Sequence, residues 1–153
     1  MSIFTKLSSE DDLKKIIKTA FDTELPINGA WGYTQSLATI ILPSDIPITQ
    51  LEHMFASMRA YVEMNMTQNE ENRYASINLN EISREEKNLG NEIYHKVHYE
   101  ITAIKESLYR AFIKEYKYNY GQEEFDLNAH FKKRKESTLH REVIHWFKLN
   151  ESL

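Results

Sequence analysis

The sequence contains no cysteine. Disulfide bonds, thiolate-bound zinc, iron–sulfur clusters and cysteine nucleophiles are therefore excluded by composition alone. Any chemistry of the chain must come from its other polar and charged side chains.

Glycine is scarce as well, with four residues scattered along the chain. The sequence has no glycine-rich loop that would cradle a phosphate, no dinucleotide fingerprint and no Gly-x-Ser-x-Gly motif. A nucleotide-dependent enzyme is disfavoured, and we expect no cofactor.

Long hydrophobic runs are also missing. No stretch is long enough to cross a membrane, and the first residues, MSIFTKLSSEDD, lack the apolar segment of a signal peptide. We therefore expect a cytoplasmic protein with no membrane contact.

The composition that remains is that of a folded domain. The chain has 153 residues, of which 41% are hydrophobic and 12% aromatic. A domain of this length buries roughly 68–70% of the surface that its unfolded chain exposes. We expect residues 1–153 to form one domain.

Apolar residues recur at helical spacing in three segments. The pattern predicts helices at about 9–21, 48–66 and 105–119, the last with Leu108 and Phe112 packed against a sheet. Strict alternation of apolar and polar residues after Tyr74 predicts a strand.

The stretch PINGAWGY holds two of the four glycines. Asn28-Gly29 predicts a two-residue hairpin turn between strands near 23–27 and 31–42, because both turn positions accept positive φ. Gly32 fits a bulge, or a place where another backbone or a ligand comes close.

The segment from Ser83 to Tyr120 supports two interpretations. Apolar spacing is compatible with one long helix, which Ser83 and Glu86 would cap. However, alternation between Lys96 and Ala103 favours a strand, and Asn88–Asn91 is good turn chemistry. Because Gly90 would weaken a helix by ~1 kcal/mol, we predict a hairpin.

The C-terminal segment is predicted as a loop, GQEEFDL, and then a helix that Ser137 opens. Leu139, Val143 and Trp146 would share one helical face with Phe147. The predicted fold is α+β: a mostly antiparallel four-stranded sheet in ββαββα order, with N-terminal and C-terminal helices and helical cover on one face.

Two Glu-x-x-His strings, Glu92–His95 and Glu142–His145, resemble the pairs that bind metals in helical bundles. With six histidines and abundant glutamate, such strings are expected by chance. On a strand, residues three apart point to opposite faces, so Glu92 and His95 would not share an ion. We expect no metal site.

A basic run, HFKKRK, follows a tyrosine-rich segment, YKYNYG. Residues 130–141 hold five Lys or Arg against one Glu, and such a run binds phosphates when aromatic rings beside it stack on bases. Alternatively, the run is a solvated segment before a helix, and its cations pair with the acidic QEEFD sequence nearby or with the acidic N-terminal part of the chain. The overall net charge of −4 counts against strong nucleic-acid affinity.

Trp31 and Tyr33, two apart on a predicted strand, point to the same face. They either close the end of the core or form an exposed aromatic anchor, and we favour the core position.

Three functions of different classes are compatible with the sequence. The leading hypothesis is a non-enzymatic module for protein contacts or self-association, with Trp31, Tyr33, Tyr116, Tyr118 and Tyr120 as contacts. The alternative is nucleic-acid binding through Lys132, Lys133, Arg134 and Lys135 with tyrosine stacking. An enzyme that uses a histidine–carboxylate pair drawn from separate elements is the third, either His98 with Glu100 or a pair that only folding brings together, and it is disfavoured because catalytic motifs are missing.

Overall fold

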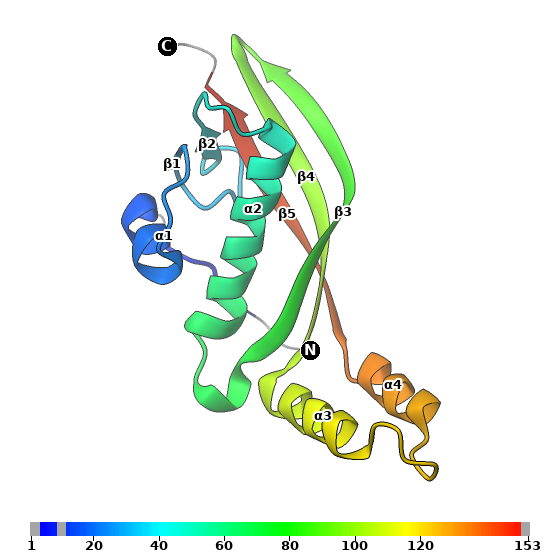
Figure 1. The fold of residues 1–153 in the computed structure, drawn as a ribbon. Coiled ribbons are helices and arrows are strands. Elements are labelled where there is room, and N and C mark those ends of the chain that lie inside the picture. Colours follow the sequence, from blue (N-terminus) through cyan, green and yellow to red (C-terminus); the bar gives the residue numbers. More distant parts are fainter. Residues whose placement is uncertain (1–3, 9–11, 151–153) are drawn as a thin grey trace.

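The computed structural model describes residues 4–8 and 12–150. Figure 1 shows the arrangement of the elements. In chain order they are α1 (Leu13–Phe21), β1 (Ile27–Gly29), β2 (Thr39–Ile41), α2 (Ile48–Tyr61), the π-helix η1 (Val62–Met66), the 3-10 helix η2 (Glu70–Asn72), β3 (Tyr74–Leu89), β4 (Glu92–Lys105), α3 (Glu106–Asn119), α4 (Leu127–Glu136) and β5 (Leu139–Leu149).

The strands form one sheet in the order β1-β2-β5-β4-β3. All neighbours are antiparallel except β2 and β5, which run parallel. The α+β class is confirmed. The predicted four-stranded, mostly antiparallel sheet is wrong in detail, because the described residues form a five-stranded mixed sheet whose middle strand is the last element of the chain.

Strand β4 confirms the hairpin interpretation. It pairs with β3 on one side and β5 on the other. Val97, Tyr99, Ile101 and Ala103 are each at most 2% exposed, whereas Lys96, His98, Glu100 and Thr102 are only partly buried. The alternation thus reports one face of a sheet that is packed against helices.

The C-terminal helix that we predicted from Ser137 is instead strand β5. Its inward positions are the odd-numbered ones and include Arg141 and His145, opposite Ile101 and Val97 of β4. Because these two inward residues are polar, the sequence lacks the alternation of apolar and polar residues that is typical of a strand. The apolar residues of the segment are also compatible with helical spacing, which led to the wrong prediction.

The predicted tight turn at Asn28-Gly29 is also wrong. Both residues lie in β1, which pairs with β2 across a loop of residues 30–38. That loop places Trp31 in the core, 1% exposed and stacked on Phe55 with ring centroids 5.5 Å apart. Burial of so large a ring stabilises the longer connection, and it confirms the core position for Trp31.

Gly32 follows in the same loop and confirms the predicted close approach. Its φ is +89°, and a Cβ there would lie 2.1 Å from the His145 ring. The Trp146 N–H donates to the Gly32 carbonyl oxygen at 2.7 Å. Only glycine fits this position without displacing the strand.

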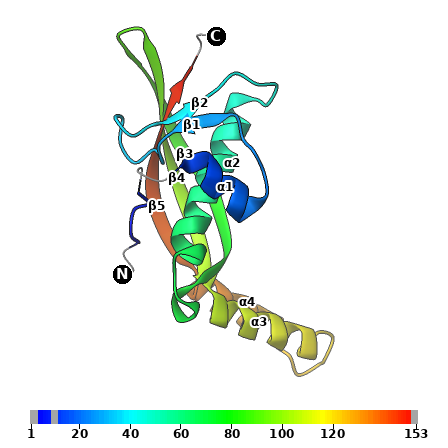
Figure 2. The same ribbon diagram turned by 90° about the vertical axis from the view of Figure 1, so that its left-hand side faces the viewer.

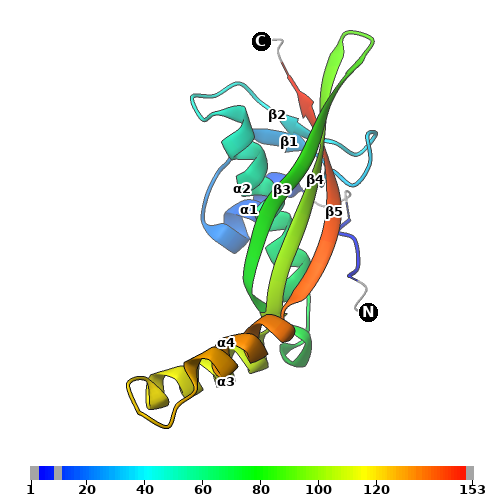
Figure 3. The ribbon, with the colours of Figure 1, turned by 90° about the vertical axis from the view of Figure 1, so that its right-hand side faces the viewer.

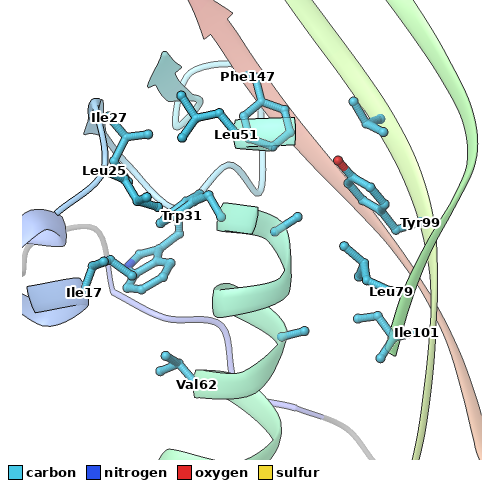
Figure 4. Packing of buried hydrophobic residues seen from close by; sticks show 14 of the residues in the cluster. Ile17, Leu25, Ile27, Trp31, Leu51, Val62, Leu79, Tyr99, Ile101 and Phe147 are labelled. Carbon is cyan, nitrogen blue, oxygen red and sulfur yellow. The ribbon is translucent and has the colours of Figure 1, made fainter. Parts of the chain in front are cut away.

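The core lies between one face of the sheet and the helices α1 and α2 (Figure 2). Leu51 of α2, Tyr99 of β4 and Phe147 of β5 meet there, and Trp31 lies near Ile17 of α1 (Figure 4). No helix covers the opposite face of β3, β4 and β5 in the described residues (Figure 3). The helical cover on one face is thus as predicted.

Helices α3 and α4 form a helical hairpin between β4 and β5 that stands away from the sheet (Figures 1 and 3). The predicted helix at 105–119 is confirmed as α3, but its packing on the sheet is wrong. Leu108 is 43% exposed, and Phe112 instead contacts His130 of α4. None of the helices in the described part of the chain has the length and apolar character needed to cross a membrane.

Candidate functional site

The α3–α4 hairpin, residues 106–136, is called the projection below. It brings together two sets of residues that the sequence treats as separate candidates. They are Tyr116, Tyr118 and Tyr120 at the end of α3, and Lys132, Lys133, Arg134 and Lys135 in α4. The basic run lies in a helix rather than in the segment before one, and Asp126 caps that helix by accepting from the Ala129 N–H at 3.0 Å.

His130 is the only buried residue described in α3 and α4. Its ring lies 5.3–5.8 Å from the rings of four aromatic residues, and its Nδ1 lies 3.3 Å from Glu115 Oε1. The four rings belong to Phe112, Tyr116, Phe125 and Phe131. His130 therefore holds the two helices together, and it is a core residue of the projection.

An apolar patch, formed by Tyr116, Tyr120 and Phe131 together with Leu127, which precedes Phe131 by one turn of α4 on the same helical face, lies on the surface of the projection. Tyr116 contacts Tyr120 at 5.1 Å and Phe131 at 6.0 Å between ring centroids. Tyr120, Leu127 and Phe131 are 66%, 38% and 45% exposed. A group of large apolar side chains in water is typical of a surface that binds a partner.

The lysines of α4 have no carboxylate partner in the described residues. Lys132, Lys133 and Lys135 are exposed, and none of them takes part in an ion pair there. The proposed pairing with the acidic QEEFD segment is therefore absent. Arg134 differs, because its guanidinium lies over the rings of Tyr109 and Phe131 at 5.8 and 5.7 Å.

The other two predicted contacts, Trp31 and Tyr33, lie far from the projection in the body of the molecule. Trp31 is buried and offers no surface. The Tyr33 hydroxyl donates to Glu63 Oε2 and accepts from the Leu7 N–H at 3.0 Å. Partial burial and the nearby Glu63 carboxylate raise the pKa of Tyr33 above its ordinary value.

Three charged residues of α2 and η1, which the sequence prediction missed, are buried against the sheet. Glu52, Arg59 and Glu63 are at most 2% exposed. Their spacing of seven and four residues puts them on one helical face, which is the available signal. Their partners lie on strands, and that is beyond the reach of a local pattern.

Glu52 forms the shortest histidine–carboxylate contact among the described residues. Its Oε2 lies 2.7 Å from His95 Nδ1, and its Oε1 accepts from Arg84 at 3.2 Å. The hydrogen bond to Glu52 raises the pKa of His95 above its ordinary value. Because Glu52 is fully buried and both its oxygens are bonded, we assign this cluster to the internal structure.

The histidine pair that the enzyme hypothesis named is not assembled. His98 Nε2 lies 3.6 Å from Glu142, and Glu100 pairs with His140 at 3.8 Å. Both distances exceed the reach of about 2.6–3.2 Å that general acid–base catalysis requires.

His145 is a core residue whose position is fixed by hydrogen bonding. Thr39 Oγ1 donates to the Ala30 carbonyl at 2.7 Å, so Nε2 of His145 donates to Thr39 at 2.9 Å. Burial lowers the pKa of His145 well below its ordinary value. Its neutral ring serves packing, stacked on Phe147 at 4.1 Å.

Neither Glu-x-x-His string forms a shared site. Glu92 pairs with Lys148 while His95 contacts Glu52, and Glu142 is exposed while His145 is buried. Within residues 4–8 and 12–150, no group of three or more His, Asp or Glu side chains is arranged to hold a metal ion.

A pocket of about 400 Å³ lies at the edge of β5. Basic side chains line it together with apolar ones, and Lys6, Arg59 and Arg141 are the basic residues. This edge pocket is the second candidate site of the molecule.

Comparison with known proteins gives no functional assignment. The sequence matches no protein-family model, and comparison with curated proteins and with solved structures finds no similar one. The projection and the edge pocket are therefore the two indications of function.

Proposed function

We propose that the chain is a non-enzymatic interaction module whose projection docks onto an acidic surface of another protein. The observation that carries the proposal is the exposed apolar patch beside lysines that have no partner in the described residues. The expected cytoplasmic location belongs to the same proposal, and fractionation of cells that express the chain tests it.

The first support is the shape of the projection. A helical hairpin that stands away from a sheet buries little apolar surface by itself, and α3 has no buried residue among those described. The exposed side chains of Tyr120, Leu127 and Phe131 lower the solubility of the protein and do not contribute to its core. A partner that covers them would recover roughly 25 cal/mol per Å² of apolar surface buried.

The second support is charge. The projection carries seven Lys or Arg and six Asp or Glu, whereas the remainder of the chain carries twelve and seventeen. The acidic residues Glu123, Glu124 and Asp126 lie in and beside the connection of the two helices, and Glu136 ends α4 directly after Lys135, but none of them forms an ion pair with an α4 lysine in the described residues. The free lysines favour an acidic partner and would speed its association at low salt.

The packing of the rings favours a protein over a nucleic acid. Nucleic-acid stacking needs free ring faces that accept separate bases. Tyr116 instead packs against Tyr120, His130 and Phe131, with interplanar angles of 40–50°. Such a cluster presents one apolar surface rather than a row of stacking positions.

The experiment compares two matched charge reversals in the full chain. One variant carries Lys132→Glu, Lys133→Glu and Lys135→Glu in α4; the control carries Lys14→Glu, Lys15→Glu and Lys18→Glu in α1, where the three lysines are also exposed. Proteins that the chain captures from an extract of the source cells are identified and purified. Calorimetry then measures their affinity for the unmodified chain and for each of the two variants.

We expect one acidic protein whose affinity falls at least about tenfold in the α4 variant and stays unchanged in the control, with weaker binding at higher salt. The proposal is overturned if binding survives the α4 reversal or if nuclease treatment removes the retained material. Light scattering that shows a dimer dependent on α4 would replace the partner with a second copy of the chain.

A further inference from the structure

The edge pocket lies where β5 has no neighbouring strand. β2 pairs only with residues 147–149 of β5. Before Phe147, the strand edge instead meets the loop at Gly32, whose carbonyl accepts from the Trp146 N–H, and the Arg59 side chain, which donates to the Ile144 carbonyl. The pocket of about 400 Å³ is lined there by Phe4, Lys6, Tyr33, Arg59, Arg141 and Ile144, among others. Its size suits a small metabolite rather than a macromolecule.

Arg59 provides a fixed positive charge at this pocket. Its guanidinium donates to the Trp31 and Ile144 carbonyl oxygens at 3.3 and 3.0 Å and lies 4.6 Å from the Tyr33 ring. The residue is 2% exposed, so its side chain is held in one position. Burial lowers the pKa of Arg59, and an anion beside it would offset that cost.

Arg141 and Lys6 add two further cations. Arg141 donates to Glu63 Oε1 at 2.8 Å and lies over the Phe4 ring at 4.5 Å, which leaves other N–H groups of its guanidinium for a ligand. Lys6 is exposed, lies 5.6 Å from the Tyr33 ring and forms no ion pair with the described residues.

The charge around the pocket is unbalanced. Its lining holds three cations, Lys6, Arg59 and Arg141, and one carboxylate, Glu142, which lies 3.6 Å from His98. The buried Glu63 carboxylate is bonded to Tyr33 and Arg141. Three cations against these two carboxylates leave one net positive charge, and Lys6 is the cation that pairs with none of the described residues.

We propose that the edge pocket binds a small organic anion. The carboxylate or phosphate group of the ligand lies at Lys6 and Arg141, where charge-assisted hydrogen bonds are available. Its hydrocarbon part lies against Phe4 and Ile144, which line the same pocket. This site is separate from the projection and does not depend on the function proposed for it.

The test titrates the isotopically labelled full chain with benzoate, with phenyl phosphate and with neutral benzamide at constant ionic strength. Backbone amide shifts report where each probe binds. Lys6→Gln removes one cation of the pocket, and Lys14→Gln makes the same change on α1, where Lys14 is equally exposed.

We expect saturable shifts at Tyr33 and Ile144 with one or both anions, and an affinity at least about threefold weaker in Lys6→Gln but not in Lys14→Gln. The stronger of the two anions identifies the head group. The proposal fails if benzamide binds as tightly as benzoate, if both variants behave alike, or if neither anion produces saturable shifts at the pocket.

Discussion

Some charged side chains are buried in the body of the molecule, meaning the described residues outside 106–136, whereas the lysines of α4 in the projection are exposed. In the body, Glu52, Arg59 and Glu63 are buried, and each is bonded to a partner on another element. In the projection, the α4 lysines lie in water without a carboxylate among the described residues, beside exposed rings. The difference teaches that the first set specifies how the chain packs on itself, while the second is free to meet another molecule.

The largest expected difference is in the free energy of unfolding, when one glycine of each region is replaced by alanine. Gly32→Ala places a Cβ 2.1 Å from the His145 ring, so we expect a loss of more than about 4 kcal/mol in the free energy of unfolding. Gly121→Ala also has a positive φ but meets nothing within 4 Å, so about 1 kcal/mol is expected. Urea denaturation measures both, and equal losses would contradict the contrast.

Removal of a cation gives the next largest difference. Arg141→Met leaves the buried Glu63 carboxylate without its ion pair, and we expect a loss of about 2–3 kcal/mol. Lys133→Met removes an exposed cation that pairs with none of the described carboxylates, so stability should change by less than about 0.5 kcal/mol. The same denaturation series compares the two; a stable Arg141→Met chain would show that Glu63 does not need its partner.

The independence of the two regions is tested by His130→Ala. This change removes the buried ring on which the packing of α3 and α4 depends. Hydrogen exchange should become at least about tenfold faster in residues 106–136, while β4 and β5 keep their protection. Uniformly faster exchange would mean that the projection and the body unfold together.

The smallest effect is a pH dependence confined to the body. The Glu52 hydrogen bond raises the pKa of His95 in the folded protein above its value in the unfolded chain, which is near 6.5. The protonated His95 ring therefore contributes its full stabilisation of the fold below about pH 6.5, and this contribution is lost as the pH rises through the folded pKa. The stability lost in His95→Gln should therefore be greater at acidic than at alkaline pH. Subtraction of the two profiles removes the opposite contribution of buried His145, whose lowered pKa costs stability at acidic pH.

The sequence predicts those elements in which side-chain polarity follows burial. Strand β4 obeys this rule because Val97, Tyr99 and Ile101 occupy its inward positions. Strand β5 breaks it, since Arg141 and His145 face the core and pair with Glu63 and Thr39. The missed strand is therefore the one that provides the polar partners of the buried residues Glu63 and Thr39.

The candidate sites divide along the same line. The tyrosines and lysines of the projection are conspicuous in the sequence composition. Their proximity in space, however, depends on the packing of α3 and α4 into a hairpin. The edge pocket is assembled from the N-terminal segment, the loop at Tyr33, α2 and β5. A local sequence pattern cannot predict this pocket, because its residues are far apart in the sequence and come together only when the sheet and the core form.

The place of β5 in the sheet has a consequence for biosynthesis. This strand emerges last from the ribosome, yet it joins β2 to β4 in the middle of the sheet. Until Leu149 has left the exit tunnel, β1–β2 and β3–β4 are two separate ribbons with exposed strand edges. The nascent chain therefore completes its core only after β5 has left the tunnel, and until then its unpaired strand edges are prone to aggregation.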